Sequence, residues 1–242
     1  MCGRYVNVAS TSDLQAEFDV EETIGEDLPP SWNIAPTDPV RIITRRRSHG
    51  GDAEQPVVQL RTVRWGLVPS WSRSRATGAK MINVRSETMA TKFRVPAGRR
   101  RGLSPSLGYY EWRRVGHGKV PYFLHGADGE LLALACLYEI WRDPELPDGH
   151  PDRWLWTSAI ITRPATDALG HIHDRCPVIV PPDLYEAWLD CGGDPAVARD
   201  LLDRIPEPHL QPRVVGSAVG NVGSDGPELI EPAAIDRDRP VR

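Results

Sequence analysis

The residue types most able to do covalent chemistry stand at the start of the chain, in Met1-Cys2-Gly3-Arg4-Tyr5. Removal of Met1 leaves Cys2 with an α-amine and a thiol on adjacent carbons. Their reference pKa values are about 7.7–8.0 and about 8.5, so both nucleophiles are usable near neutral pH. An aldehyde can condense with the amine, and addition of the thiol to the imine carbon then closes a five-membered thiazolidine. Cys2 could equally be a small apolar residue at a chain start, so its interpretation depends on the rest of the sequence.

Further candidates are polar residues set in apolar, strand-like patterns. Asn83 and Arg85 are one strand period apart, so both side chains project from one face. Glu111 lies among aromatic residues, which would desolvate its carboxylate and raise its pKa toward general-acid work. His173 precedes an Asp-Arg pair at the start of an apolar strand, and imidazole suits proton transfer near neutrality. Taken singly, each also has a structural interpretation: an amide clamping a turn, a carboxylate at a sheet edge and a structural histidine.

Length and composition favour a soluble, cytoplasmic protein. The 242 residues are enough for a sizeable core, and they contain no apolar run long enough to span a membrane. Arg4, Asp13 and Glu17 interrupt any signal-peptide pattern. The four cysteines are scattered and lack CxxC spacing, so we expect free thiols and no zinc or disulfide framework.

The net charge of −4 conceals an asymmetry along the chain. Residues 61–101 contain eleven Lys or Arg and one acid, Glu87, which gives this stretch a charge of +10 and leaves −14 for the remainder. Such an imbalance indicates one electropositive face that binds a polyanionic ligand. The alternative is a solvated arginine surface with no ligand.

The pattern along the chain predicts one α+β domain with a largely antiparallel β core and short peripheral helices. Many strand-like segments and few long helices occur, without βαβ alternation or internal repeats. We expect a capping box from Ser12 to open a first helix, and Ser86 to cap another that runs to about Lys92. Strands on both sides of residues 127–129 form a predicted hairpin. The domain spans residues 1–232, and the charged tail 233–242 is expected to be disordered.

Taken together, several separated motifs resemble the SRAP family, the SOS response-associated peptidases that shield abasic sites. The resemblance runs from residue 2 to about residue 232. It implies the family's own α+β fold and covalent capture of abasic sites in single-stranded DNA. The motifs occur in the family's order and approximate spacing: MCGR, WNIAPT, WGLVPSW, NVRSET, GYYEW and HDRCPVIV.

The resemblance assigns roles to individual positions. Residues that match the family's catalytic set are the crosslinking nucleophile Cys2, the amine-holding Asn83 and the acid/base pair Glu111 and His173. Residues that match contacts to the DNA backbone are Arg4, Arg85 and Arg175. Residues that match the strand-binding groove are Asn33, Pro36 and Trp71, with Thr162 as a polar pocket residue.

The implied mechanism begins with an abasic sugar that is mostly a closed hemiacetal. Glu111 delivers a proton to the ring oxygen, His173 shuttles protons, and Asn83 orients the amine of Cys2. Capture then needs no metal and no organic cofactor. Met1 must first be removed, by self-cleavage or by a host aminopeptidase. Abasic-site lyase activity, a monomeric state and association with the nucleoid when bound to DNA are further expectations.

Two segments depart from the family pattern. The family usually has a second aromatic residue after the Trp71 position, where this chain has Ser72, which predicts a weaker stacking or wedge contact. The segment before GYYEW usually reads RCLVPADG and here reads RGLSPSLG at residues 101–108, which predicts different packing behind Glu111.

Two other classes of function fit part of the sequence. An amino-terminal-nucleophile amidohydrolase, such as a glutamine amidotransferase, also begins with MCG and uses the α-amine as base. That class has no use for the basic stretch or for Trp71. A non-catalytic module for single-stranded DNA would use both, but it has no need of a processed Cys2.

Overall fold

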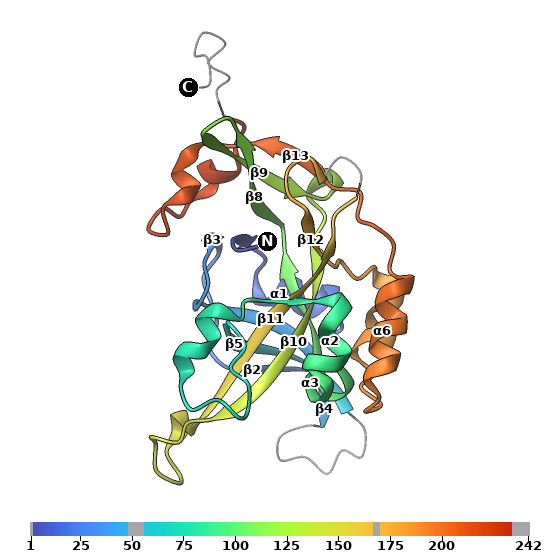
Figure 1. The fold of residues 1–242 in the computed structure, drawn as a ribbon. Helices are drawn as coiled ribbons and strands as arrows, with labels where there is room; N and C mark the ends of the chain where they lie inside the picture. Colours follow the sequence, from blue (N-terminus) through green and yellow to red (C-terminus); the bar gives the residue numbers. More distant parts are fainter. Residues whose placement is uncertain (1, 48–55, 167–169, 234–242) are drawn as a thin grey trace.

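The computed structural model describes residues 2–47, 56–166 and 170–233, in which strands dominate (Figure 1). The strands are β1 (Tyr5–Asn7), β2 (Glu22–Ile24), β3 (Ser31–Ile34), β4 (Pro39–Arg47), β5 (Pro56–Trp65), β6 (Asn83–Arg85), β7 (Arg101–Ser106), β8 (Gly108–Val115), β9 (Gly118–His125), β10 (Leu132–Arg142), β11 (Trp154–Pro164), β12 (Arg175–Pro177) and β13 (Gln211–Val214). The helices are α1 (Thr11–Glu17), α2 (Ser86–Lys92), α3 (Arg94–Arg99), α5 (Tyr185–Leu189) and α6 (Pro195–Arg204).

The larger sheet closes on itself into a barrel. Its strands follow the order β12-β11-β10-β7-β4-β5-β2, and β11 also pairs with β5 in parallel, so β5, β4, β7, β10 and β11 form a ring. Alternating side chains of these strands fill the interior, among them Ile42, Val63, Cys136 and Ile160. A closed ring leaves few free strand edges, and the filled interior makes it a packed core rather than a channel.

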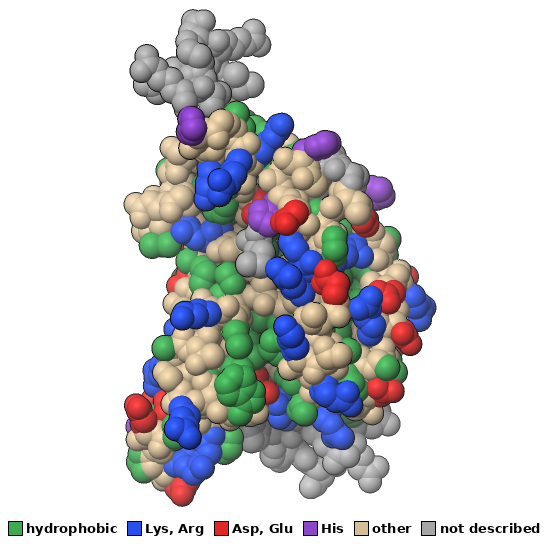
Figure 2. Space-filling model, viewed as in Figure 1, with side chains coloured by type: hydrophobic (Ala, Val, Ile, Leu, Met, Phe, Trp, Pro, Cys, Tyr) green, Lys and Arg blue, Asp and Glu red, His purple; other side chains and the backbone are tan. Residues whose placement is uncertain are grey.

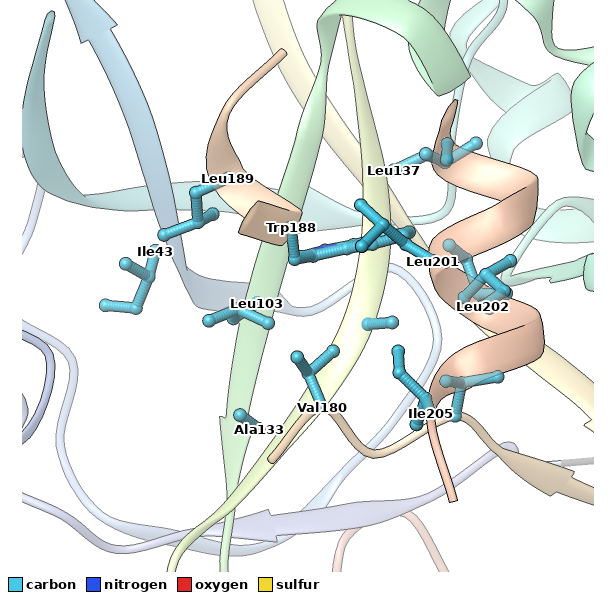
Figure 3. Close-up of a cluster of buried hydrophobic side chains, with 14 of the residues drawn as sticks. Ile43, Leu103, Ala133, Leu137, Val180, Trp188, Leu189, Leu201, Leu202 and Ile205 are labelled. Carbon is cyan, nitrogen blue, oxygen red and sulfur yellow. The ribbon is translucent and has the colours of Figure 1, made fainter. Parts of the chain in front are cut away.

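Helices cover the outer face of the barrel. The residues that point outward from β7 and β10 join a second apolar cluster with Trp188 of α5 and with Leu201 and Leu202 of α6. Figure 3 shows Trp188 lying flat over these strands, with α6 packed beside it. The alternation of inward and outward side chains is the expected consequence of a two-residue strand period.

The smaller sheet has the order β13-β9-β8-β1-β3 and carries the beginning of the chain into the middle of the molecule (Figure 1). In β1, Tyr5 pairs with Tyr109 of β8 on one side and with Ile34 of β3 on the other. Cys2, Tyr5 and Tyr109 belong to the same apolar cluster as the barrel interior. The start of the chain therefore packs against the barrel interior, where it is held between two strands.

The observed fold confirms the predicted α+β class with a largely antiparallel core and short helices. The domain boundary at residue 232 stays a prediction, because residues 234–242 lie outside the described residues. No helix among the described residues is long and apolar enough to cross a membrane.

Three local predictions are wrong. The capping box of α1 is formed by Ser10 and Asp13, not by Ser12, because the helix begins at Thr11. Ser86 is the first residue of α2 and makes no cap, since its hydroxyl bonds to the Glu87 carboxylate instead. The strands beside residues 127–129 do not pair, because β9 joins the smaller sheet and β10 the barrel.

The single electropositive face predicted from residues 61–101 is also only partly present. Seven of the eleven cations are exposed, but Arg61 is 8% exposed and lies over the Trp156 ring at 3.8 Å. Arg101 is 1% exposed, and its guanidinium donates to the backbone oxygens of Trp188, Ala97 and Asp190. Part of the basic stretch is therefore internal structure rather than surface charge.

Candidate functional site

Cys2 is fully buried, next to the barrel interior. Tyr5 anchors this end of the chain: its hydroxyl accepts from Ser104 at 3.3 Å, and its ring meets the edge of Trp65 at a centroid distance of 5.1 Å. Burial, followed by the Glu111 carboxylate, raises the pKa of the Cys2 thiol well above its ordinary value. The resting sulfur is therefore protonated, and a reaction at this thiol requires removal of its proton.

Asn83 holds the backbone of Cys2. The Asn83 Nδ2 donates to the Cys2 carbonyl oxygen at 2.8 Å, from the short strand β6 that pairs in parallel with β11. The other amide atom, Oδ1, is buried and accepts no hydrogen bond from the described residues. An acceptor in this position suits the α-amine of Cys2, as the sequence predicts.

Glu111 projects from β8, beside Tyr109 and close to Cys2. The side chain is 3% exposed, and burial raises the pKa of its carboxyl group above the ordinary value. The charge of His173 acts in the opposite direction on the same carboxyl group. The structure thus brings the Glu111 carboxyl within electrostatic reach of both Cys2 and His173, and these groups are of the kinds that general acid–base chemistry uses.

His173 lies in the loop before β12, half-buried, with two partners at Nδ1. The backbone N–H of Arg175 donates to this nitrogen at 3.0 Å, and the exposed carboxylate of Asp174 lies 2.9 Å from it. A neutral ring can accept from Arg175, whereas a protonated ring donates to Asp174. The contacts with Arg175 and Asp174 therefore fix the position of the ring in the loop before β12.

Arg175 and Thr162 form a buried unit. The Arg175 guanidinium makes two contacts with Glu87, at 2.5 and 3.0 Å, and donates to the Thr162 carbonyl oxygen at 2.5 Å. Arg175 is 9% exposed and Thr162 is fully buried. Their assignment to DNA contacts stays a prediction, and the observed contacts give both residues a positioning role behind His173.

Arg4 and Asn33 fasten the segment 217–224 to the smaller sheet. Arg4 donates to Asn33 Oδ1 at 2.8 Å and to the Val219 carbonyl oxygen at 2.9 Å. The Asn33 amide donates to the backbone oxygens of Asn221 and Ser224, at 3.0 and 2.7 Å. Contacts of these two residues with DNA stay a prediction, and their observed hydrogen bonds join β1, β3 and the segment 217–224.

Trp71 stands out from the surface, with 76% of its side chain exposed. It borders a groove of about 410 Å³ between the loop of residues 67–71 and residues 91–96 of α2 and α3. Met81, two residues before Asn83, forms another part of the wall. Figure 2 shows a hydrophobic patch on this face with Lys and Arg side chains around it.

Ser72 turns inward from the same loop. It is 9% exposed, its hydroxyl lies 2.8 Å from the Thr77 hydroxyl, and its carbonyl oxygen accepts from Trp141. Trp71 is therefore exposed without an aromatic residue directly after it, and a weaker stacking or wedge contact stays a prediction. The second segment that departs from the family pattern includes residues 101–106, which form the fully buried strand β7 and pair with β10 and β4.

Two further predicted residues lie at the surface of the site. Arg85 ends β6, is exposed and forms no ion pair with the described residues. Pro36 is half-buried in the turn between β3 and β4, where the next residue, Thr37, has a φ of 80°. Asp38 holds this turn through a hydrogen bond from the Ala35 N–H at 2.9 Å.

Two residues near the site were not singled out from the sequence. Glu87 was named only as an acid within the basic stretch, although its isolation among cations signals an ion pair. Tyr109 is one of the aromatic residues around Glu111, and no sequence pattern indicates a role for its hydroxyl. Among the described residues, no group of three or more His, Cys, Asp or Glu is placed to hold a metal ion.

The fold is thus a barrel whose packed interior adjoins the buried Cys2, with the Asn83 amide and the Glu111 carboxyl close to this cysteine. Comparison with family descriptions identifies the class of this protein. Residues 1–222 match the family called SOS response associated peptidase (SRAP), so the chain belongs to this family.

Relatives of similar length are found in bacteria. The chain is 33% identical over 236 residues to the abasic site processing protein YoqW of Bacillus subtilis, covering 96% of this chain and 99% of the relative. It is 30% identical to the abasic site processing protein YedK of Escherichia coli, over 96% of this chain and all of the relative. A solved structure from Bacteroides thetaiotaomicron shares the fold, with a TM-score of 0.77 and 23% identity over 96% of this chain and all of that one.

Proposed function

We propose that this protein captures abasic sites in single-stranded DNA through a thiazolidine on its processed Cys2. The observation that carries the proposal is the arrangement at Cys2, which joins a buried thiol, the Asn83 amide and the Glu111 carboxyl. The names of the relatives, as abasic site processing proteins, supply the substrate class. The partner is DNA that contains abasic sites, and no step requires a metal or an organic cofactor.

Opening of the abasic sugar is the first task of the site. Glu111, whose pKa is raised by burial, donates a proton to the ring oxygen while the anomeric hydroxyl gives its proton to His173 or water. The bond between the anomeric carbon and the ring oxygen breaks, which frees the aldehyde. The α-amine of Cys2 adds to this aldehyde, and loss of water leaves an imine. Asn83 Oδ1 accepts from the amine and aims it at the carbon.

Ring closure is the second task. The Cys2 thiol loses its proton, His173 or a water molecule receives it, and the sulfur adds to the imine carbon. The electron pair of the C=N bond moves to the nitrogen, which takes up a proton. The thiazolidine that results protects the aldehyde from β-elimination, whereas a long-lived imine would allow lyase-type strand cleavage.

The DNA strand is held by charge and stacking. Arg85 provides an exposed cation beside Asn83, and Trp71 provides an exposed ring at the edge of the groove. Phosphate contacts are independent of sequence and sensitive to salt, and stacking tolerates any base. Arg4, Asn33 and Pro36 would line the strand's path, and Arg175 with Thr162 would support it from behind.

Removal of Met1 has to precede capture. Self-cleavage would make the protein a peptidase as well as a DNA-crosslinking enzyme, and a cellular aminopeptidase could act instead. A monomer in the cytoplasm, associated with the nucleoid when bound to DNA, completes the proposal.

The test is to mix the purified chain, with its Met1 removed as verified by mass, with a single-stranded oligonucleotide that carries one abasic site. We expect a protein–DNA band that survives heat and denaturant, and its loss in Cys2→Ala. An oligonucleotide without the abasic site serves as the control. A band that forms equally with Cys2→Ala, or no band at all, contradicts the proposal. Release of ammonia from glutamine by the wild type would instead favour an amidohydrolase.

A further inference from the structure

Tyr109 is an anomaly beside Cys2. Its ring is fully buried, and its hydroxyl forms no hydrogen bond with the described residues. A buried polar group without a partner costs stability, and phenylalanine would fill the same space without that cost. The presence of tyrosine therefore calls for a partner that appears during the reaction.

The surroundings of the hydroxyl indicate what that partner is. Tyr109 and Cys2 belong to one buried cluster, and Tyr109 pairs with Tyr5 in the adjacent strand β1. The groups that interact electrostatically with the Tyr109 hydroxyl are Cys176, Cys2 and Glu111. Of these, only the Cys2 sulfur develops new negative charge during ring closure.

We propose that the Tyr109 hydroxyl donates a hydrogen bond to the Cys2 sulfur as the thiol is deprotonated, and so assists thiazolidine closure. The inference rests on the proposed function and adds a residue to it. A thiolate is stabilised by donors. The backbone N–H of Arg4 already supplies one donor to this sulfur, and the phenol supplies a second.

The charged and titratable groups around the sulfur make such help necessary. Glu111 on β8 and Cys176 on β12 both disfavour a negative charge on Cys2, as does burial itself. The Tyr109 hydroxyl adds no negative charge near the sulfur, because burial raises its pKa well above the ordinary value and keeps it protonated. The proton of Tyr109 is thus available for donation without being lost.

A neighbouring tyrosine provides a matched control. Tyr110 lies on the opposite face of the same strand, and its hydroxyl donates to the Trp32 carbonyl oxygen at 2.8 Å. Removal of this hydroxyl breaks a structural hydrogen bond far from the thiol chemistry. Tyr109→Phe should therefore slow ring closure without lowering the melting temperature, whereas Tyr110→Phe should lower the melting temperature without slowing ring closure.

The experiment measures heat-stable adduct formation with an abasic oligonucleotide across pH 6 to 9 (from about two units below the reference thiol and amine values to about one unit above them). We expect Tyr109→Phe to slow closure roughly 10- to 100-fold throughout this range, because loss of a donor raises the thiol pKa further and both thiols titrate above the range. Its borohydride-trapped imine should form at the wild-type rate, and its melting temperature should be unchanged or higher. Tyr110→Phe should crosslink normally and melt at a lower temperature.

The inference would be overturned if Tyr109→Phe closed the thiazolidine at the wild-type rate at every pH. It would also be overturned if the substitution slowed imine formation and ring closure to the same extent. The first result leaves Tyr109 as a space-filling residue, and the second places its effect before the thiol step. If the wild type itself forms no heat-stable adduct, the proposed function fails instead, so the two failures are distinguishable.

Discussion

At the scale of single residues, burial is the main influence on the reactive groups of the site. It raises the pKa of both the Cys2 thiol and the Glu111 carboxyl, so each group holds its proton to a higher pH than it would in water. The raised pKa of Glu111 favours its proposed role as an acid, and that of Cys2 opposes premature reaction of the thiol. In the proposed reaction, the amine of Cys2 binds the aldehyde and brings the carbon to the sulfur.

Glu111→Gln tests the acid directly. Gln keeps the shape of the side chain but cannot deliver a titrating proton, so capture should slow by a factor of roughly 10² to 10⁴ while binding of an intact strand is unchanged. Wild-type capture should decline as the pH rises through the raised pKa of Glu111, and the variant should lack this dependence. Capture rates over pH, beside binding curves with intact DNA, decide the matter. A variant that captures at the wild-type rate would leave Glu111 as a structural residue.

The same substitution predicts a change in stability with a definite sign. Because the folded-state pKa of Glu111 is raised, this group stabilises the fold below its ordinary pKa and loses that contribution as the pH rises through the raised value. Glu111→Gln should therefore melt at an equal or higher temperature than the wild type at neutral pH. The advantage should vanish in acid. Thermal melts at pH 4 and pH 8 (on either side of about 4.3, the ordinary Glu value) check it.

The amine of Cys2 is as necessary as its thiol, because the ring contains both atoms. A tag or acetyl group on the amino terminus should abolish the heat-stable adduct as completely as Cys2→Ala does. Binding of intact single-stranded DNA should survive in the tagged protein. Gel analysis after heating, with a carboxyl-terminal tag as control, is the measurement. A heat-stable adduct with a blocked amino terminus would rule out a thiazolidine.

At the scale of elements, local patterns predicted the strands better than their partners. The predicted abundance of strands is confirmed, for example by β5, which ends at Trp65, and by β8, which begins at Gly108. The pairing of β9 with β10 did not follow, since a turn at residues 127–129 fixes only the local path and not the sheet that each strand joins. Barrel closure by the parallel contact of β5 with β11 connects residues about 93 positions apart, such as Arg64 and Thr157, and carries no local signal.

For the candidate site too, the sequence predicted the residues better than their contacts. Cys2, Asn83, Glu111 and His173 were predicted from their types and motifs, and the structure brings their elements together. The buried contacts of Arg175 and the inward turn of Ser72 were not predictable, because they depend on three-dimensional packing. The Tyr109 hydroxyl, which is buried without a hydrogen-bond partner among the described residues, was not predictable for the same reason.

The ion pair between Glu87 of α2 and Arg175 of β12 predicts a second effect of pH on the stability of the fold, opposite in sign to that of Glu111. Hydrogen bonds from Arg175 lower the pKa of Glu87 to about 2, so its ion pair stabilises the fold above the ordinary pKa of a glutamate. That stabilisation is lost as the pH falls through the lowered value. Glu87→Gln leaves the buried Arg175 without its carboxylate and should lower the melting temperature at pH 7.

The gap between wild type and Glu87→Gln should narrow as the pH falls from about 4.5 toward about 2, the range between the ordinary and the lowered pKa of Glu87. Asp203→Asn is the matched control, because its ion pair with Arg199 lies on the exposed surface of α6. An exposed pair of this kind contributes little. Equal melting temperatures for Glu87→Gln and the wild type at pH 7 would show that the ion pair between Glu87 and Arg175 does not stabilise the fold.

At the scale of the whole molecule, the charge distribution separates two kinds of arginine. Arg61 and Arg101 are internal, where they stack on rings or bind backbone oxygens, and they are therefore unavailable to a ligand. Of the exposed cations, Lys92 and Arg94 line the groove that Trp71 borders, and Arg85 ends β6. The basic surface proposed for DNA is thus smaller than the sequence suggested, and β6 connects it to Cys2 through Asn83.

The salt dependence of binding should report this smaller surface. Arg85→Glu removes an exposed cation at the end of β6 and should weaken binding of an intact single strand, because each phosphate contact releases counterions. Loss of one contact should reduce the slope of log K against log salt by roughly 0.7. Arg142→Glu is the matched control, since Arg142 is exposed at the far end of β10, in an ion pair with Asp148. Fluorescence anisotropy at several salt concentrations measures both slopes. If the two variants bind alike, the strand does not pass over β6, and the path from Arg85 to Cys2 would have to be abandoned.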